Sequence, residues 1–209
     1  MSHFPFYINI QQKKGILIAD EDAMRKEILF KVDKLLPFGP ILWLVSEYIP
    51  FDFERSTEVI CKRRKFQESD LIGASFVVVA TNDEAYNRSI CEQCRNRGVF
   101  INVVDEVDKC DFIFPSILHK GKLTVGVTTE GASPQIGIEI RKHLEDYLPT
   151  DIEQILDYLM EIREEAKQRI QKDEDRRNFL KELSSYCFKT GTIPNETIKE
   201  EWFDGYEKK

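Results

Sequence analysis

Short apolar runs alternate with helix-like segments through the first half of this 209-residue chain, and this alternation constrains the fold more than any other feature. A strand followed by a helix and a further strand favours a parallel sheet with right-handed crossovers, because the connection must return to the same end of the sheet. The expected strands are 15–19, 41–45, 58–62, 75–80 and 101–104, and the expected helices are 21–36 and 84–97.

The pattern changes after Asp105. Segments 112–118 and 122–129, joined by His119-Lys120-Gly121, are typical of an antiparallel strand pair. Helices are predicted over 134–147, 151–171 and 173–187, before a break at 191–195 and a weakly structured tail. We therefore expect an α/β fold, a doubly wound parallel sheet followed by a small α+β segment and a helical carboxyl-terminal region. The expected domains are 1–111, 112–148 and 149–209.

Composition indicates a soluble globular protein, with 42% hydrophobic and 32% charged residues. No apolar run reaches the roughly 18 residues of a membrane span, and the start has no signal-peptide pattern, so we expect a cytoplasmic protein without a membrane partner. The formal net charge of −7 argues against nucleic acid as the main partner, because phosphate binding needs clustered Lys and Arg.

Asp105 directly follows the apolar run 101–104, which is typical of a strand buried on both faces. In open α/β sheets, ligands bind beyond the carboxyl ends of the strands, where this acid is expected to lie. An acid at such a position also commonly caps a turn or a helix. The position alone is therefore compatible with a chemical or a structural role.

A second candidate site follows the apolar segment 123–129, at Glu130-Gly131-Ala132-Ser133-Pro134. Ser133 is suited to cap a helix that has Pro134 at its first position, and Gly131 permits a backbone conformation that side chains resist. The free N–H groups of a first helical turn attract carboxylate or phosphate. An ordinary connection between a strand and a helix has the same pattern.

The five cysteines and three histidines do not predict a metal site. Cys91 and Cys94 form a C-x-x-C pair on the predicted helix 84–97, but no second pair completes a tetrahedral zinc site, and a structural role is favoured. His119 and His143 lack a ligand spacing, so we name no stable metal site. Lys120, Lys122, Arg141 and Lys142 are candidate partners for a polycarboxylate, although surface positions are the commoner explanation for such charges.

Three motifs together resemble one family. NVVD, CDFIFP and a TxxGASP turn, in this order and at these intervals, are similar to the precorrin-2 dehydrogenase/sirohydrochlorin ferrochelatase family of siroheme biosynthesis. The opening FPFYINIQQKKGILI, the stretch FVVVATNDEAYN and the helical carboxyl-terminal region also fit, so the resemblance covers most of the chain.

The resemblance implies a Rossmann-like domain, an NAD-dependent oxidation of precorrin-2 to sirohydrochlorin and, in some members, insertion of Fe²⁺ into sirohydrochlorin. It implies that Asp105 acts as general base in either reaction. It also implies that Thr129, Gly131, Ala132 and Ser133 line the tetrapyrrole site. Related proteins are intertwined homodimers, so a homodimer is expected here, with a region around 112–148 as the dimerisation segment.

The chain departs from this family at the first strand-to-helix turn. Where the family has a run of glycines, this chain has Ile18-Ala19-Asp20, followed by the acids Glu21 and Asp22. Cβ atoms and negative charges at this turn oppose the approach of a pyrophosphate but suit a helix start, so NAD binding is doubtful. The residues expected to line a nucleotide cleft are Glu21, Asp22, Ser46, Glu47, Thr81, Asn82 and Val104.

Three hypotheses for function follow. The first is an NAD-dependent precorrin-2 dehydrogenase with or without ferrochelatase activity, which the extent of the resemblance favours. The second is a sirohydrochlorin metal chelatase that does not use NAD, which the lost glycines favour. The third is a non-catalytic protein that binds a tetrapyrrole or a partner, and the presence of Asp105 argues against it.

Overall fold

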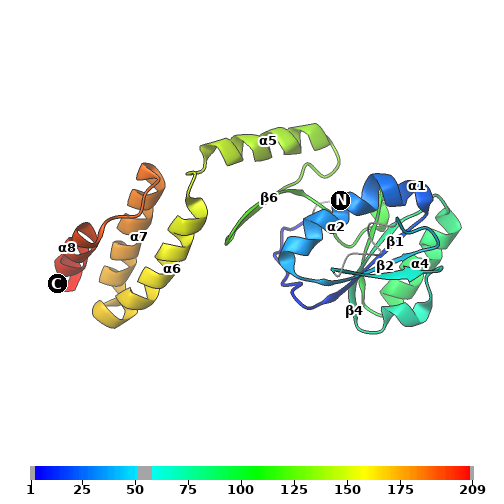
Figure 1. The fold of residues 1–209 in the computed structure, drawn as a ribbon, viewed down its shortest axis with the longest axis horizontal. Coiled ribbons are helices and arrows are strands. Elements are labelled where there is room, and N and C mark those ends of the chain that lie inside the picture. The colour runs from blue at the N-terminus through cyan, green and yellow to red at the C-terminus, as the bar shows by residue number, and fades with distance from the viewer. Residues whose placement is uncertain (1–2, 51–57, 208–209) are drawn as a thin grey trace. The chain divides into compact units, whose positions relative to one another are not determined.

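A computed structural model describes residues 3–50 and 58–207 and divides the chain into two compact units, 1–114 and 115–209 (Figure 1). The strands of the first unit are β1 (Lys14–Ala19), β2 (Ile41–Ser46), β3 (Val59–Arg63), β4 (Ala74–Ala80) and β5 (Phe100–Val103). Its helical segments are α1 (Glu21–Ala23), the π-helix η1 (Met24–Ile28), α2 (Leu29–Leu35), η2 (Leu36–Phe38), η3 (Glu68–Leu71), α4 (Glu84–Asn96) and η4 (Val107–Lys109).

The five strands that the structure describes in the first unit pair in parallel, in the order β3-β2-β1-β4-β5. The chain runs outward from β1 through β2 to β3, and then crosses back to β4 on the other side of β1. The winding direction therefore reverses between the neighbouring strands β1 and β4. This reversal marks a doubly wound sheet, and in such sheets ligands bind in the crevice beyond the carboxyl ends of the two strands at the reversal.

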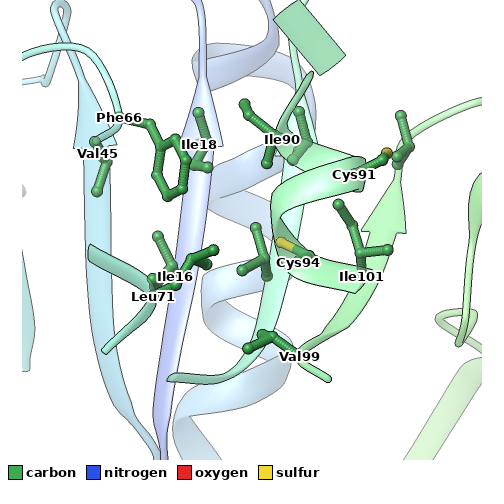
Figure 2. Close-up of a cluster of buried hydrophobic side chains, with 13 residues drawn as sticks. Ile16, Ile18, Val45, Phe66, Leu71, Ile90, Cys91, Cys94, Val99 and Ile101 are labelled. Atoms are coloured by element: carbon green, nitrogen blue, oxygen red, sulfur yellow. The ribbon is translucent and has the colours of Figure 1, made fainter. Parts of the chain in front are cut away.

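The central strands bury both of their faces, which explains their continuous apolar sequences. Figure 2 shows one face, where Ile90, Cys91 and Cys94 of α4 point toward Ile16 and Ile18 of β1 and their neighbours. Leu17 and Ala19 of β1 lie on the opposite face. There they belong to the same cluster as apolar side chains of the first helical segments, namely Met24, Ile28, Val32 and Leu35.

Over residues 115–207, the second unit contains a β-hairpin and four helices. Strands β6 (Ser116–Lys120) and β7 (Leu123–Val127) pair antiparallel, and Gly121 supplies a positive φ of 54° at the turn between them. The helices are α5 (Pro134–Tyr147), α6 (Ile152–Arg169), α7 (Asp173–Thr190) and α8 (Glu196–Glu207). The last three share an apolar cluster that includes Ile155, Phe179 and Phe203.

The predicted fold class is confirmed: a doubly wound parallel sheet precedes a small α+β part and a helical carboxyl-terminal region. The prediction of a weakly structured tail was wrong, because Glu196–Glu207 forms α8 and buries Phe203 completely. The predicted helix 21–36 is interrupted by the π-helix Met24–Ile28. The structure places one unit boundary at 114/115, near the predicted 111/112, and the further division at 148/149 stays a prediction.

Candidate functional site

The carboxyl edge of the parallel sheet brings together most of the residues that the sequence predicted for a nucleotide cleft. Ser46 ends β2, while Thr81 and Val104 directly follow β4 and β5. Glu21 and Asp22 form the exposed first turn of α1 after β1. Because parallel strands end at one edge, residues far apart in the sequence meet here.

The turn between β1 and α1 consists of a single residue, Asp20, whose carboxylate makes two hydrogen bonds. Oδ1 accepts from the N–H of Ala23 at 2.9 Å, which caps the start of α1. Oδ2 accepts from the N–H of Asn82 at 2.7 Å, beyond the end of β4. The half-buried carboxylate of Asp20 therefore spans the crevice between β1 and β4.

The connection from β4 to α4 is held by its own polar side chains. The hydroxyl of Thr81 donates to the amide oxygen of Asn87 at 2.6 Å, and the Asn87 amide donates back to the carbonyl of Thr81 at 2.9 Å. Asp83 caps α4 by accepting from the N–H of Tyr86 at 3.0 Å. Thr81 and Asn82 thus lie at this edge, with the Thr81 hydroxyl engaged in the turn and the Asn82 N–H bonded to Asp20.

Ser46 and Glu47 differ in exposure. Ser46 is buried, and its hydroxyl oxygen accepts from the N–H of Tyr48 at 3.1 Å. Glu47 is exposed at the same edge. The Ser46 hydroxyl therefore stabilises the local turn, and the Glu47 carboxylate faces solvent.

Asp105 is the second residue after β5 and has a left-handed backbone with φ of 63°. Val104 before it is half-buried, and its N–H donates to the carbonyl of Val79 on β4 at 2.9 Å, which fixes the chain at this edge. The Asp105 side chain is exposed beside a hollow of about 470 Å³ that residues 105–109 line. Asp and Asn tolerate this conformation better than most residues, so Asp105 adopts it at modest cost.

Lys31 of α2 is a charged neighbour of Asp105 that the sequence patterns did not single out. Burial lowers the pKa of Lys31, while the negative charges of Glu27 and Asp105 act in the opposite direction. The ammonium lies 4.7 Å from the centre of the Phe114 ring. In the sequence, Lys31 occupies a position within the apolar spacing of an amphipathic helix, and this unusual place for a charge could have identified it. Only the fold brings Lys31 near Asp105.

The turn at Thr129–Ser133, in the second unit, uses both of its predicted hydroxyl groups locally. Thr129 Oγ1 accepts from the N–H of Ser133 at 3.1 Å and donates to the carbonyl of Ser133 at 2.9 Å. Ser133 caps α5, since its hydroxyl oxygen accepts from the N–H of Ile136 at 3.3 Å. Glu130 and Gly131 both have positive φ, of 53° and 85°. The predicted helix start is present, with Ala132 inside this tight turn.

The thiols of the C-x-x-C pair face the core. Cys91 and Cys94 are both buried on α4, and burial raises the pKa of each, to about 12 for Cys94. A thiol with a raised pKa is a poor nucleophile and a poor metal ligand. The structural role predicted for the pair agrees with this environment.

Over residues 3–50 and 58–207, no cluster of His, Cys, Asp and Glu is arranged to hold a metal ion. His119 instead shares a 2.9 Å hydrogen bond between its Nδ1 and the Thr124 hydroxyl across the β6–β7 hairpin. In the same described ranges, no helix is long and apolar enough to cross a membrane.

A family model described as putative NAD(P)-binding matches residues 16–116, from β1 to the start of β6. The chain is 30% identical over 207 residues to siroheme synthase 2 of Aeromonas salmonicida, covering 97% of this chain and 41% of that protein. It is 28% identical over 187 residues to siroheme synthase of Nitrosomonas eutropha, covering 88% of this chain and 38% of that protein. This chain therefore spans about two fifths of the length of these relatives.

Among solved structures, the precorrin-2 dehydrogenase SirC has the same fold, with a TM-score of 0.74. The match covers 99% of this chain and 100% of SirC at 20% sequence identity. The sequence relatives align with nearly the whole chain, which includes the NVVD, CDFIFP and TxxGASP motifs. The family model on the first unit, the siroheme synthase relatives over nearly the whole chain and this fold over both units support the expected resemblance to the precorrin-2 dehydrogenase/sirohydrochlorin ferrochelatase family.

Proposed function

We propose that this chain is an enzyme of siroheme biosynthesis that acts on a precorrin-2-type tetrapyrrole, with NAD-linked oxidation of precorrin-2 to sirohydrochlorin as its leading reaction. The names of the sequence relatives and of the similar solved structure, SirC, support the pathway and the oxidoreductase class. The parallel sheet with the order β3-β2-β1-β4-β5 supports a domain descended from a dinucleotide-binding one.

The placement of Asp105 is the observation that carries the proposal. Its carboxylate is exposed at the carboxyl edge of the sheet, beside a hollow, on a backbone that few residues adopt. Uncommon backbone conformations cluster at functional sites. An exposed carboxylate at this edge suits a general base, which would take a proton from the macrocycle as it is oxidised.

The Thr129–Ser133 turn is the proposed contact for the carboxylate groups of the substrate. The start of α5 provides the positive end of a helix of 14 residues. Because Thr129 and Ser133 already hold the turn, the proposed contribution of this segment is a rigid, correctly shaped surface rather than free hydroxyl donors.

A second reaction, insertion of Fe²⁺ into sirohydrochlorin without NAD, is favoured by the turn between β1 and α1. The Asp20 carboxylate accepts hydrogen bonds from Ala23 and Asn82 in the crevice where a dinucleotide pyrophosphate would need donors. As folded, this turn does not fit the pyrophosphate. Asp105 would then accept the pyrrole N–H protons that the incoming metal ion, as substrate, displaces.

Substitution of Asp105 tests the proposal. Asp105→Asn keeps the side-chain shape and tolerates the left-handed backbone, but it cannot take a proton at neutral pH. We expect turnover to fall by a factor on the order of 10² to 10⁴ in whichever reaction the chain catalyses. The measurements are anaerobic formation of sirohydrochlorin from precorrin-2 with NAD⁺, and formation of sirohaem from sirohydrochlorin and Fe²⁺ without it.

Asp33→Asn is the control, because Asp33 is an exposed acid on α2 and the substitution is chemically the same. It should leave either rate unchanged. If Asp105→Asn retained full turnover while folding normally, the assignment of Asp105 as base would be wrong. If wild-type protein catalysed neither reaction, the enzymatic proposal itself would fail.

A further inference from the structure

We propose that Asp20 is an affinity-determining residue for nucleotide: its carboxylate takes the place of a bound pyrophosphate at the crevice between β1 and β4. The inference rests on the proposed function only for the choice of NAD⁺ as the nucleotide. It follows from the position of Asp20, from the two N–H groups that it engages and from the packing of the residues before it.

The position of Asp20 is fixed by the pairing of β1 with β4. Ala19 lies in register with Ala80, so the residues that follow the two strands are neighbours although they are 62 positions apart. The N–H of Asp20 also faces the carbonyl of Ala80 at 3.3 Å. Its side chain therefore lies at the reversal point of the sheet, where nucleotides bind in doubly wound folds.

The two donors that Asp20 engages are those suited to an anion. The N–H of Ala23 belongs to the first turn of a helix, and the N–H of Asn82 belongs to the turn that precedes α4. Both bonds are of normal length, 2.9 and 2.7 Å, so the carboxylate satisfies both donors at once. A pyrophosphate at this crevice would have to displace the carboxylate and would also meet its negative charge.

The two residues before Asp20 are held by core packing, so this side of the turn cannot move away to admit a pyrophosphate. Ile18 and Ala19 are 2% and 6% exposed and pack on opposite faces of the sheet. Their side chains pack in the core and do not line an open loop. Asp20 is thus the residue at this turn whose removal frees donors without creating a cavity.

The test is calorimetric titration of the full-length protein with NAD⁺ for wild type, Asp20→Ser and Asp83→Ser. Serine keeps a hydroxyl that caps the helix but is too short to reach Asn82 as well. Asp83 is the matched control, because it carries the same charge at the same edge and caps α4 through a bond within its own turn. We expect Asp20→Ser to bind NAD⁺ at least about tenfold more tightly than wild type, and Asp83→Ser to bind as wild type does.

Hydrogen exchange of backbone amides gives a second readout that is independent of catalysis. The Asn82 amide should lose protection in Asp20→Ser and regain it when NAD⁺ is added, whereas the Ala23 amide, which the serine hydroxyl still caps, should stay protected. Asp20→Asn keeps the side-chain size and removes the charge, so it replaces Asp20→Ser in the titration if that variant does not fold. It should also bind NAD⁺ more tightly than wild type.

Two results would overturn the inference. One is a wild-type affinity equal to that of both Asp20 variants, and the other is no binding by either variant. Neither result depends on Asp105 or on tetrapyrrole turnover. A failure of the proposed reaction is therefore distinguishable from a failure of this inference.

Discussion

At the residue scale, the role of each acidic residue in this protein depends on what its carboxylate contacts. Asp20 accepts two backbone N–H groups across a crevice, whereas Asp105 is held exposed by a left-handed backbone. Asp70 is the third type: its side chain is 4% exposed and accepts two hydrogen bonds from the Arg64 guanidinium, at 2.7 and 2.8 Å. The first two acids bear on function, and the third bears on stability.

Asp70 should make stability depend on pH. Burial alone would raise the pKa of Asp70, but the hydrogen bonds from Arg64 and from the Gln67 N–H, with nearby positive charge, outweigh burial and lower it. A group whose pKa is lowered by folding stabilises the protein above its unfolded pKa of about 4, and this contribution is lost as pH falls through the folded pKa.

We therefore expect Asp70→Asn to lower the free energy of unfolding by about 2 kcal/mol at pH 7, because Arg64 loses its charged partner. The difference from wild type should shrink as pH falls below about 4. Urea unfolding at a series of pH values measures both effects. Glu68→Gln is the control, since Glu68 pairs with Arg97 at the exposed surface. A difference that did not change with pH would contradict this account.

At the element scale, Arg169 joins α6 to α8. Its guanidinium donates to both carboxylate oxygens of Glu200, at 2.9 and 2.8 Å, and lies 3.9 Å from the centre of the Phe203 ring. It also pairs with Glu165 of its own helix. The hydrogen bonds to Glu200, Glu165 and Glu207 raise the pKa of Arg169 further, so its charge is constant over the working pH range.

Arg169→Met should destabilise the carboxyl-terminal helices by about 1–3 kcal/mol, since it removes a bidentate ion pair and a cation–π contact while keeping apolar bulk. Chemical unfolding followed by helical circular dichroism would measure this. Lys167→Met is the matched control, because Lys167 pairs with the exposed Glu164 within the same helix. Equal effects of the two substitutions would show that the Arg169 contact between α6 and α8 contributes no more to stability than an ion pair within one helix.

At the scale of the whole molecule, apolar surface on α5 agrees with the homodimer expected from the family resemblance. Ile136 and Ile140 are 54% and 42% exposed and lie four residues apart, on one face of the helix. Large exposed aliphatic side chains grouped on one face are typical of an interface. The homodimer stays a prediction.

We expect light scattering to give a mass of twice 24.5 kDa for the wild type, and a monomer for the double variant Ile136→Glu, Ile140→Glu, because a carboxylate in an apolar interface costs free energy. Ile72→Glu is the control, as Ile72 is 68% exposed in the first unit. A monomeric wild type, or a double variant that still dimerises, would refute the assignment of α5 to the interface.

The pattern of the sequence predicted the elements better than their ends. The central strands were predictable because burial on both faces demands continuous apolar runs such as 75–80. The helix α8 was missed because its sequence alternates acids with aromatic residues, and Phe203 becomes helical core only when α6 and α7 surround it. The interruption of the first helix by Met24–Ile28 has no clear local signal either.

By itself the sequence determined the doubly wound class, the family resemblance and the position of Asp105 after a strand, since these depend on local periodicity and on motifs. Only the tertiary structure decided what the acidic turn does. The bond from Asn82 to Asp20 joins residues 62 positions apart, and it exists because β1 and β4 pair in register. Local pattern cannot encode such a contact, because the distance between two turns is set by the pairing of whole strands.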